Sequence, residues 1–308
     1  MLLIGSQAAK FHFPEFSHNR DWDVIGTISE IANWVKTYKQ EIISYKYNEN
    51  KTKISIKTQN RKFEFEIVEP NSSSELFCEI NKTVKLEEFY VASPNSLKLI
   101  KRSHLTHPIH WEKNIEDYHF LKTKIKKHPS EKELEAFEKR KKEIDLRIGK
   151  IKTNLNMSNE DFFKKSSKIG RIYNHDDLHK VTCFYANPLY EFLKKDKTKA
   201  KIDKEMFFNL LYLDQIRTVQ EECFAIALER KIIPELEKGN FGNLGFCGGN
   251  LDREKAFMYA LKRICTNLTS GWFRDFAIEN YPKIKDFQVD YVEKFTTAIK
   301  NNIITKRS

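Results

Sequence analysis

The 308-residue chain carries 54 Lys and Arg against 43 Asp and Glu, which gives a formal net charge of +11. No apolar run approaches the roughly 20 residues that cross a bilayer, and the start lacks the basic region of a signal peptide. The five cysteines are scattered and form no Cys-x-x-Cys pair. We therefore expect a cytoplasmic protein with no membrane partner. The charge indicates either a polyanionic partner such as RNA or merely the Lys-rich product of an AT-biased genome.

The first 26 residues combine two short strands with residue types that bind phosphate and metal ions. The apolar stretch Leu2–Ile4 leads into Gly5-Ser6 and the first turns of a helix. After a loop, residues 21–25 predict a strand in which Asp21 and Asp23 share one face, because side chains alternate. Two carboxylates held this way suit a divalent cation such as Mg²⁺. Backbone N–H groups of a Gly-Ser turn at a helix start suit a phosphate.

The following residues predict further strands and helices of the same domain. Thr27-Ile28-Ser29-Glu30 is a capping box, and apolar residues continue at helical spacing as far as Ile42. Period-two alternation predicts a hairpin of strands over 53–58 and 62–68. A helix over 72–80, a strand over 88–92 and a helix opened by Ser93-Pro94 follow. We expect a mixed sheet flanked by helices, in a domain that covers residues 1–122.

The character of the chain changes near residue 121. Residues 121–152 contain 12 Lys or Arg against 6 Asp or Glu. An apolar stripe, interrupted by Lys141, predicts a long amphipathic helix with a basic outer face: Leu134, Phe137, Ile144, Ile148, Ile151 and Leu155. This helix is either a solvated helix packed on the domain or a rail for nucleic acid. The later residues also favour helices, so we expect an α+β protein with an all-helical domain over 123–308.

The pattern Gly5-Ser6 followed by Asp21-x-Asp23 on the next strand resembles the nucleotidyltransferase superfold, the DNA polymerase β-like family. The resemblance covers residues 1–122. It implies that Gly5 and Ser6 hold a nucleoside triphosphate such as ATP, and that Asp21 and Asp23 bind two Mg²⁺ ions. It also implies a third carboxylate from a later strand. Glu64 and Glu66 both match that position and share one face, so the choice between them stays open.

The helices after residue 93 resemble those that close minimal nucleotidyltransferase domains. Their Lys-x-x-x-Asp-x-x-x-Leu spacing is matched by Lys113, Asp117 and Leu121, and Lys98 or Lys101 would hold a phosphate. The implied reaction moves a nucleoside monophosphate from the triphosphate to a hydroxyl of RNA, a protein or a small molecule. The alternative is a catalytically silent fold that binds nucleic acid or a protein partner.

Two later segments carry further candidate residues. His175-Asp176-Asp177-Leu178-His179, if helical, sets two histidines one turn apart, which suits a transition metal in a phosphohydrolase or nuclease. A capped helix start with exposed histidines is the simpler interpretation. Arg274, in Gly271-Trp272-Phe273-Arg274, belongs either to an acceptor pocket or to a packing corner. Both segments resemble uncharacterised nucleotidyltransferase-like proteins of large bacteriophages, for which the compartment would be the host cytoplasm.

Overall fold

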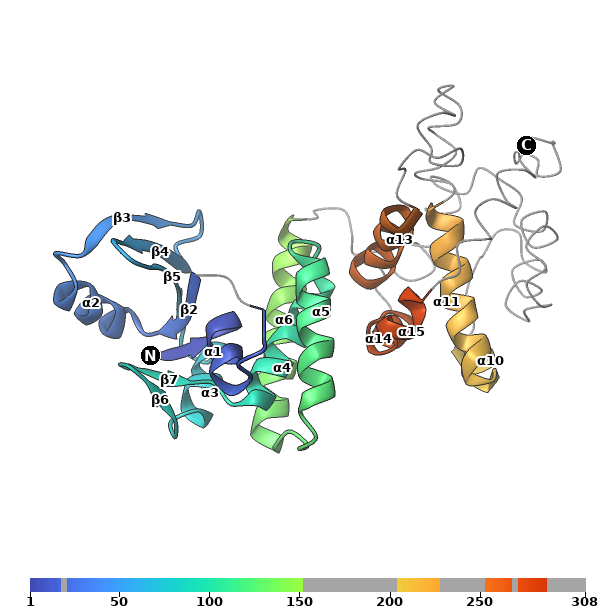
Figure 1. Ribbon diagram of the computed structural model, residues 1–308, viewed down its shortest axis with the longest axis horizontal. Coiled ribbons are helices and arrows are strands. Elements are labelled where there is room, and N and C mark those ends of the chain that lie inside the picture. Colours follow the sequence, from blue (N-terminus) through green and yellow to red (C-terminus); the bar gives the residue numbers. More distant parts are fainter. Residues whose placement is uncertain (18–20, 152–203, 228–252, 268–270, 287–308) are drawn as a thin grey trace, which may run out of the picture. The chain divides into compact units, whose positions relative to one another are not determined.

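The structure, a computed structural model, describes residues 1–17, 21–151, 204–227, 253–267 and 271–286 (Figure 1). The chain divides into two compact units, Met1–Ile151 and Lys152–Ser308. The first unit combines a mixed sheet with helices, and the described part of the second unit is helical. The expected α+β class is therefore confirmed. None of the described helices is both long and apolar enough to cross a membrane.

The described part of the first unit is built on a seven-stranded sheet in the order β3-β4-β5-β2-β1-β7-β6. Its strands are β1 (Leu2–Ile4), β2 (Asp21–Gly26), β3 (Ile42–Tyr47), β4 (Lys53–Thr58), β5 (Lys62–Ile67), β6 (Lys85–Leu86) and β7 (Phe89–Val91). Strand β2 lies at the centre, antiparallel to β1 and parallel to β5. The strand that carries the two predicted aspartates is thus held on both sides.

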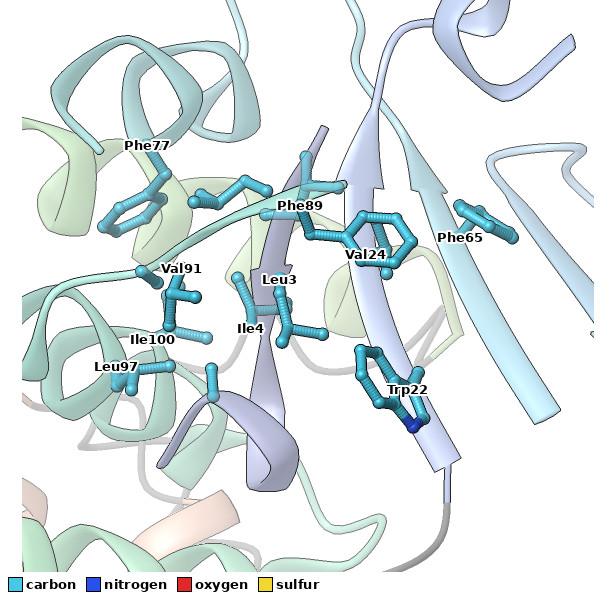
Figure 2. Packing of buried hydrophobic residues seen from close by; sticks show 14 of the residues in the cluster. Leu3, Ile4, Trp22, Val24, Phe65, Phe77, Phe89, Val91, Leu97 and Ile100 are labelled. Atoms are coloured by element: carbon cyan, nitrogen blue, oxygen red, sulfur yellow. The ribbon is translucent and has the colours of Figure 1, made fainter. Parts of the chain in front are cut away.

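One face of the sheet is apolar, because every second residue of the central strands is aromatic or aliphatic. Helix α2 (Ile28–Thr37) covers this face, with the Trp34 ring centroid 4.7 Å from that of Phe63 and 5.1 Å from that of Phe65. Figure 2 shows part of the hydrophobic core, including Trp22 of β2 and Phe89 of β7. Burying these side chains fixes the register of the strands, since a slip of one residue would expose the apolar side chains to solvent.

The other face is partly covered by helices that follow the strands in the chain. They are α1 (Gly5–His12), α3 (Ser73–Ile80), α4 (Pro94–Ser103), a short 3-10 helix η1 (His104–Thr106), α5 (Trp111–Lys124) and α6 (Glu131–Ile151). The predicted helix starts are confirmed: the Thr27 side chain accepts from the backbone N–H of Glu30, and that of Ser93 from Ser96. Such caps fix the residue at which each helix begins.

Residues 42–47 form strand β3 rather than the end of the preceding helix. Helix α2 ends at Thr37, and β3 pairs with β4 in antiparallel register. The residues of β3 include β-branched and aromatic types at alternate positions, which favour a pleated strand once a partner is present. The helical spacing that reached Ile42 was therefore misleading over its last residues.

Helix α6 is joined to the sheet and to α3 by buried and half-buried polar contacts. Arg140 donates two hydrogen bonds to Glu66 of β5, at 3.0 and 2.8 Å, and both side chains are buried. Glu143 accepts hydrogen bonds from the backbone N–H and the hydroxyl of Ser73, at 2.8 and 2.6 Å. The first compact unit consequently runs to Ile151, beyond the boundary at residue 122 expected from the sequence.

The inward face of α6 differs from the predicted apolar stripe. Leu134 is 44% exposed, whereas Ala136, Arg140 and Ile144 are buried. Glu133, also on the packed side, accepts a hydrogen bond from the hydroxyl of Ser93 at 2.7 Å. Charged side chains with specific partners therefore orient this helix, and hydrophobic periodicity cannot reveal such partners.

The described part of the second unit contains five helices. They are α10 (Lys204–Asn209), α11 (Tyr212–Ala227), α13 (Arg253–Asn267), α14 (Gly271–Glu279) and α15 (Tyr281–Lys285). An aromatic cluster joins α10 to α14. The ring of Phe207 lies 5.3 Å from Trp272, 5.6 Å from Phe273 and 4.9 Å from Phe276 between centroids. Edge-to-face pairs of this kind add to the stabilisation that burial provides.

We expect Arg140→Met to lower the free energy of unfolding of the first unit by about 3–5 kcal/mol, because Glu66 would remain as a buried, unpaired charge. Burial alone would raise the pKa of Glu66, but the charge and hydrogen bonds of Arg140 bring it below its ordinary value of 4.5. The ion pair therefore stabilises fully above pH 4.5, and this contribution is lost as the pH falls below that value.

Urea unfolding of the wild type and of Arg140→Met at several pH values measures the difference between their free energies of unfolding. Lys142→Met is the matched control, because Lys142 is exposed on the same helix and its replacement should change stability by less than about 0.5 kcal/mol. Equal losses in the two variants would contradict the structural role of the Arg140–Glu66 pair.

Candidate functional site

The second face of the central strands carries charged residues in matching register. Across the parallel pair β2–β5, Asp21 lies opposite Lys62 and Asp23 lies opposite Glu64. The Lys62 ammonium is 2.9 Å from Asp21 Oδ2 and 2.7 Å from Glu64 Oε1. The hydrogen bonds to Glu64 and Asp21 raise the pKa of Lys62, so this group stays charged. The structure thus brings three of the predicted carboxylates to one place and adds a lysine between two of them.

Asp23 is the carboxylate whose charge is least compensated. The side chains of Asp21 and Glu64 are 37% and 42% exposed, whereas Asp23 lies deeper. Burial raises the pKa of Asp23 from 3.8 to about 6; Lys101 counteracts this rise, and Glu64 adds to it. A buried carboxylate beside a second one is a position where an added positive charge is stabilising.

The predicted Gly-Ser turn lies against this carboxylate. Pairing of Ile4 with Asp23 brings the start of α1 next to β2. Gly5 has a φ of +70°, and a Cβ atom at this residue would overlap the Asp23 carboxylate. Only glycine combines this backbone conformation with so close an approach. Ser6, the next residue, is buried.

Helices α4 and α5 supply positive charge beside the carboxylates. Lys101 of α4 is 2.8 Å from Asp117 Oδ2 and donates to Asn114 Oδ1 at 3.3 Å. Lys101 and Lys113 both lower the pKa of Asp23, which shows that their charges act at the site. Lys98, one turn earlier on α4, is half-buried. On α5, Asp117 pairs with Lys101 of α4, and the charges of Lys101 and of Lys113 on α5 itself both act on Asp23.

The two glutamates proposed as the third carboxylate have different surroundings. Glu64 lies directly opposite Asp23. Glu66 is buried, and it accepts hydrogen bonds from Arg140 and from the hydroxyl of Ser74. Of the pair, Glu64 is therefore the one available to act with Asp21 and Asp23.

Sequence reasoning named Lys101 and Lys113 but missed two other lysines near this site. Lys62 lies between two carboxylates, and Lys53 of β4 acts on Asp23, Glu66 and His104. Burial, followed by the charges of Arg140 and Lys53, lowers the pKa of His104 well below 6.5, so its imidazole is neutral at pH 7. The alternation of residues in β4 and β5 indicates that these lysines share a face of their strands. Placing them beside the carboxylates also requires knowing which strands pair.

The remaining predicted residues lie elsewhere. His175, Asp176 and His179 are outside the described residues. Arg274 lies on α14 in the second unit and is buried, 4.0 Å from Asp275 Oδ1. The structure therefore gives Arg274 an interior position within its own helical unit.

The carboxylates have the chemistry of a magnesium site, although they do not enclose an ion position as they stand. Among the described residues, no three His, Cys, Asp or Glu side chains are arranged to hold a metal ion. Asp21 and Glu64 instead share the Lys62 ammonium. Three carboxylates are the hard oxygen donors that Mg²⁺ prefers, and burial, which raises the pKa of Asp23, leaves a carboxylate whose charged form a cation would stabilise. The donor set fits Mg²⁺ if Lys62 moves aside.

Comparison with protein families matches residues 96–304 to a family described as a domain of unknown function, DUF7275. The chain belongs to this family. The DUF7275 match begins at Ser96, inside α4, and includes Lys101, Asp117 and Arg140. It includes none of the strands β1–β7, which carry the carboxylates. Comparison with curated proteins gives no match.

We expect Asp23→Asn to raise the free energy of unfolding at pH 7. A native pKa of about 6, above the ordinary 3.8, means that the ionised carboxylate destabilises the fold. A difference of one pH unit between the native and unfolded pKa corresponds to about 1.4 kcal/mol, so the gain is up to about 3 kcal/mol. It should shrink as the pH falls through 6 and vanish below 3.8, where the carboxyl is protonated in both states.

Thermal unfolding of the wild type and of Asp23→Asn, from below pH 3.8 up to pH 7, measures the effect. The control Asp21→Asn removes a half-exposed partner of Lys62 and should lower stability by about 1 kcal/mol or less. A loss of stability in Asp23→Asn at pH 7 would contradict the prediction.

Proposed function

We propose that the protein is a Mg²⁺-dependent nucleotidyltransferase, which moves a nucleoside monophosphate from a nucleoside triphosphate to a hydroxyl. The observation that carries this proposal is the alignment of Asp23 with Glu64 beside Gly5, at the start of α1. Carboxylates for metal ions and the backbone N–H groups of a helix start for phosphates are then adjacent, as the chemistry requires.

The residues have distinct tasks in this reaction. Asp21, Asp23 and Glu64 would hold the magnesium ions, whose positive charge would polarise the α-phosphate and the acceptor hydroxyl. The backbone N–H groups of Gly5 and Ser6 bind the triphosphate. The acceptor hydroxyl gives up its proton to solvent water, and its oxygen bonds to the α-phosphorus as the bond to the β-phosphate oxygen breaks. Pyrophosphate leaves with its negative charge.

Lys101 neutralises part of that charge. Its ammonium is held by Asp117 and Asn114, so it acts from a fixed position. Fixed charges of this kind stabilise a transition state without reorganising. His104, neutral and close to Lys101, leaves the positive charge of the site to the lysines and the metal ions.

We expect label transfer from α-³²P nucleoside triphosphates in the presence of Mg²⁺, tested with RNA, protein and small hydroxyl acceptors. Asp23→Asn should reduce the rate by about 10³-fold, because it removes a proposed magnesium ligand. Lys101→Met should reduce it by about 10²-fold, because it removes a fixed positive charge beside the reacting phosphates. Lys142→Met, outside the site, should keep the wild-type rate. Transfer that persists in Asp23→Asn would contradict the assignment of the site.

The position of Lys62 favours a second candidate function, a nucleotidyltransferase fold that binds a partner without catalysis. In such a protein the ammonium permanently replaces the metal between Asp21 and Glu64. A lysine in this position neutralises the carboxylates but cannot activate a hydroxyl.

Lys62→Met separates the two functions. In an enzyme, removal of the competing ammonium should strengthen Mg²⁺ binding, so that Mg²⁺ raises the melting temperature more in the variant than in the wild type. In a silent fold, the variant should be less stable at all Mg²⁺ concentrations. Melting curves with and without Mg²⁺, with Lys142→Met as the control, measure this difference.

A further inference from the structure

The charged face of the sheet continues beyond the carboxylates onto β4 and β3. One row across the strands contains Asp23, Glu64, Ser55 and Lys46, each paired with the next. Because paired residues of adjacent strands point to the same face, Lys46 and Asp23 lie on one surface. Neighbouring strands are about 4.8 Å apart, so Lys46 lies roughly 14 Å from Asp23 along this row.

A second row contains Asp21, Lys62, Lys57 and Ser44 in the same way. Two strand spacings, about 10 Å, separate Lys57 from Asp21. A third row pairs Lys53 with Glu66. The face is thus acidic at β2, mixed at β5, and basic over β4 and β3.

This basic part of the face is open. Lys46, Lys53 and Lys57 are exposed, in contrast to Glu66, which is buried under α3 and α6. Figure 1 shows β3 and β4 at the end of the sheet away from α4, α5 and α6. Lys62 and Lys101 have carboxylate partners, whereas no ion pair within the described residues engages Lys46 or Lys57.

We propose that this open face of β3 and β4 binds single-stranded RNA and leads its terminal hydroxyl to the carboxylates. The proposal rests on the nucleotidyl transfer proposed above, for which RNA would be the acceptor. Lys57 and Lys46 lie about 10–14 Å from the aspartates of β2. At this distance they can bind the phosphates of the nucleotides that come just before the reacting end of the RNA.

The chemistry of the face favours RNA over a protein partner. Its residues on β3 and β4 are lysines and serines, without the apolar centre typical of protein interfaces: Ser44, Lys46, Lys53, Ser55 and Lys57. Lys53 and Lys57 are four residues apart, about 13 Å, a length that a short stretch of a single strand covers. Serine hydroxyls beside the lysines suit the 2′-hydroxyls that distinguish RNA from DNA.

The test compares RNA binding of Lys46→Gln/Lys57→Gln with that of the wild-type chain, by fluorescence anisotropy of labelled oligo(U). Loss of two phosphate contacts should reduce the slope of log affinity against log salt concentration by about 1.4, since each single-strand contact contributes about 0.7. The control Lys36→Gln/Lys39→Gln removes the same charge from α2 and the turn after it, and α2 covers the opposite face. The control should retain the wild-type slope.

Several outcomes overturn the proposal. These are no RNA binding by the wild-type chain, equal losses in both double variants, and equal affinity for oligo(U) and the matching DNA. Binding is measured without nucleoside triphosphate, so it is independent of catalysis. If the lysine pair determines RNA binding but no label is transferred, the surface is supported and the proposed transferase function fails. If label is transferred and the lysine pair is without effect on binding, the surface is overturned and the function stands.

Discussion

The parallel register of β2 and β5 is the constraint on which the candidate site depends. It pairs Asp23 with Glu64 and Asp21 with Lys62, and it simultaneously turns Trp22 and Phe63 to the opposite face. Burial of the aromatic side chains thus holds the charged ones in line, because one register serves both faces. The site takes its geometry from hydrophobic packing behind it, and the ionised Asp23 lowers the stability that this packing provides.

Local signals predicted much of this arrangement. Alternation in residues 21–25 and 62–68 was sufficient to predict two strands, and the side chains of Thr27 and Ser93 marked helix starts that the structure confirms. These features are short-range, so they are encoded within a few residues. The same alternation predicts that the side chains of Asp21 and Asp23 lie on one face of β2. The proposed use of these residues in nucleotidyl transfer stays a prediction.

Long-range partners could not be predicted in this way. Glu64 and Glu66 are equivalent by alternation. The pairing of Glu64 with Asp23 and the approach of Arg140, 74 residues after Glu66, distinguish them. Strand β3 was missed because its pairing with β4 decides its conformation, whereas its first residue also fits a helical spacing. The basic character of the open face likewise appears only when β3, β4 and β5 are set side by side, since its lysines are dispersed between residues 46 and 62.

The Arg140–Glu66 pair also bears on what counts as a folding unit in this family. The DUF7275 match contains Arg140 but begins at Ser96, so it separates the arginine from its carboxylate. An excised segment that starts there would begin within α4 and would bury a guanidinium with no counterion. The segment matched by the family and the compact unit Met1–Ile151 therefore differ in extent, and a fragment that keeps the ion pair must include the strands that precede residue 96.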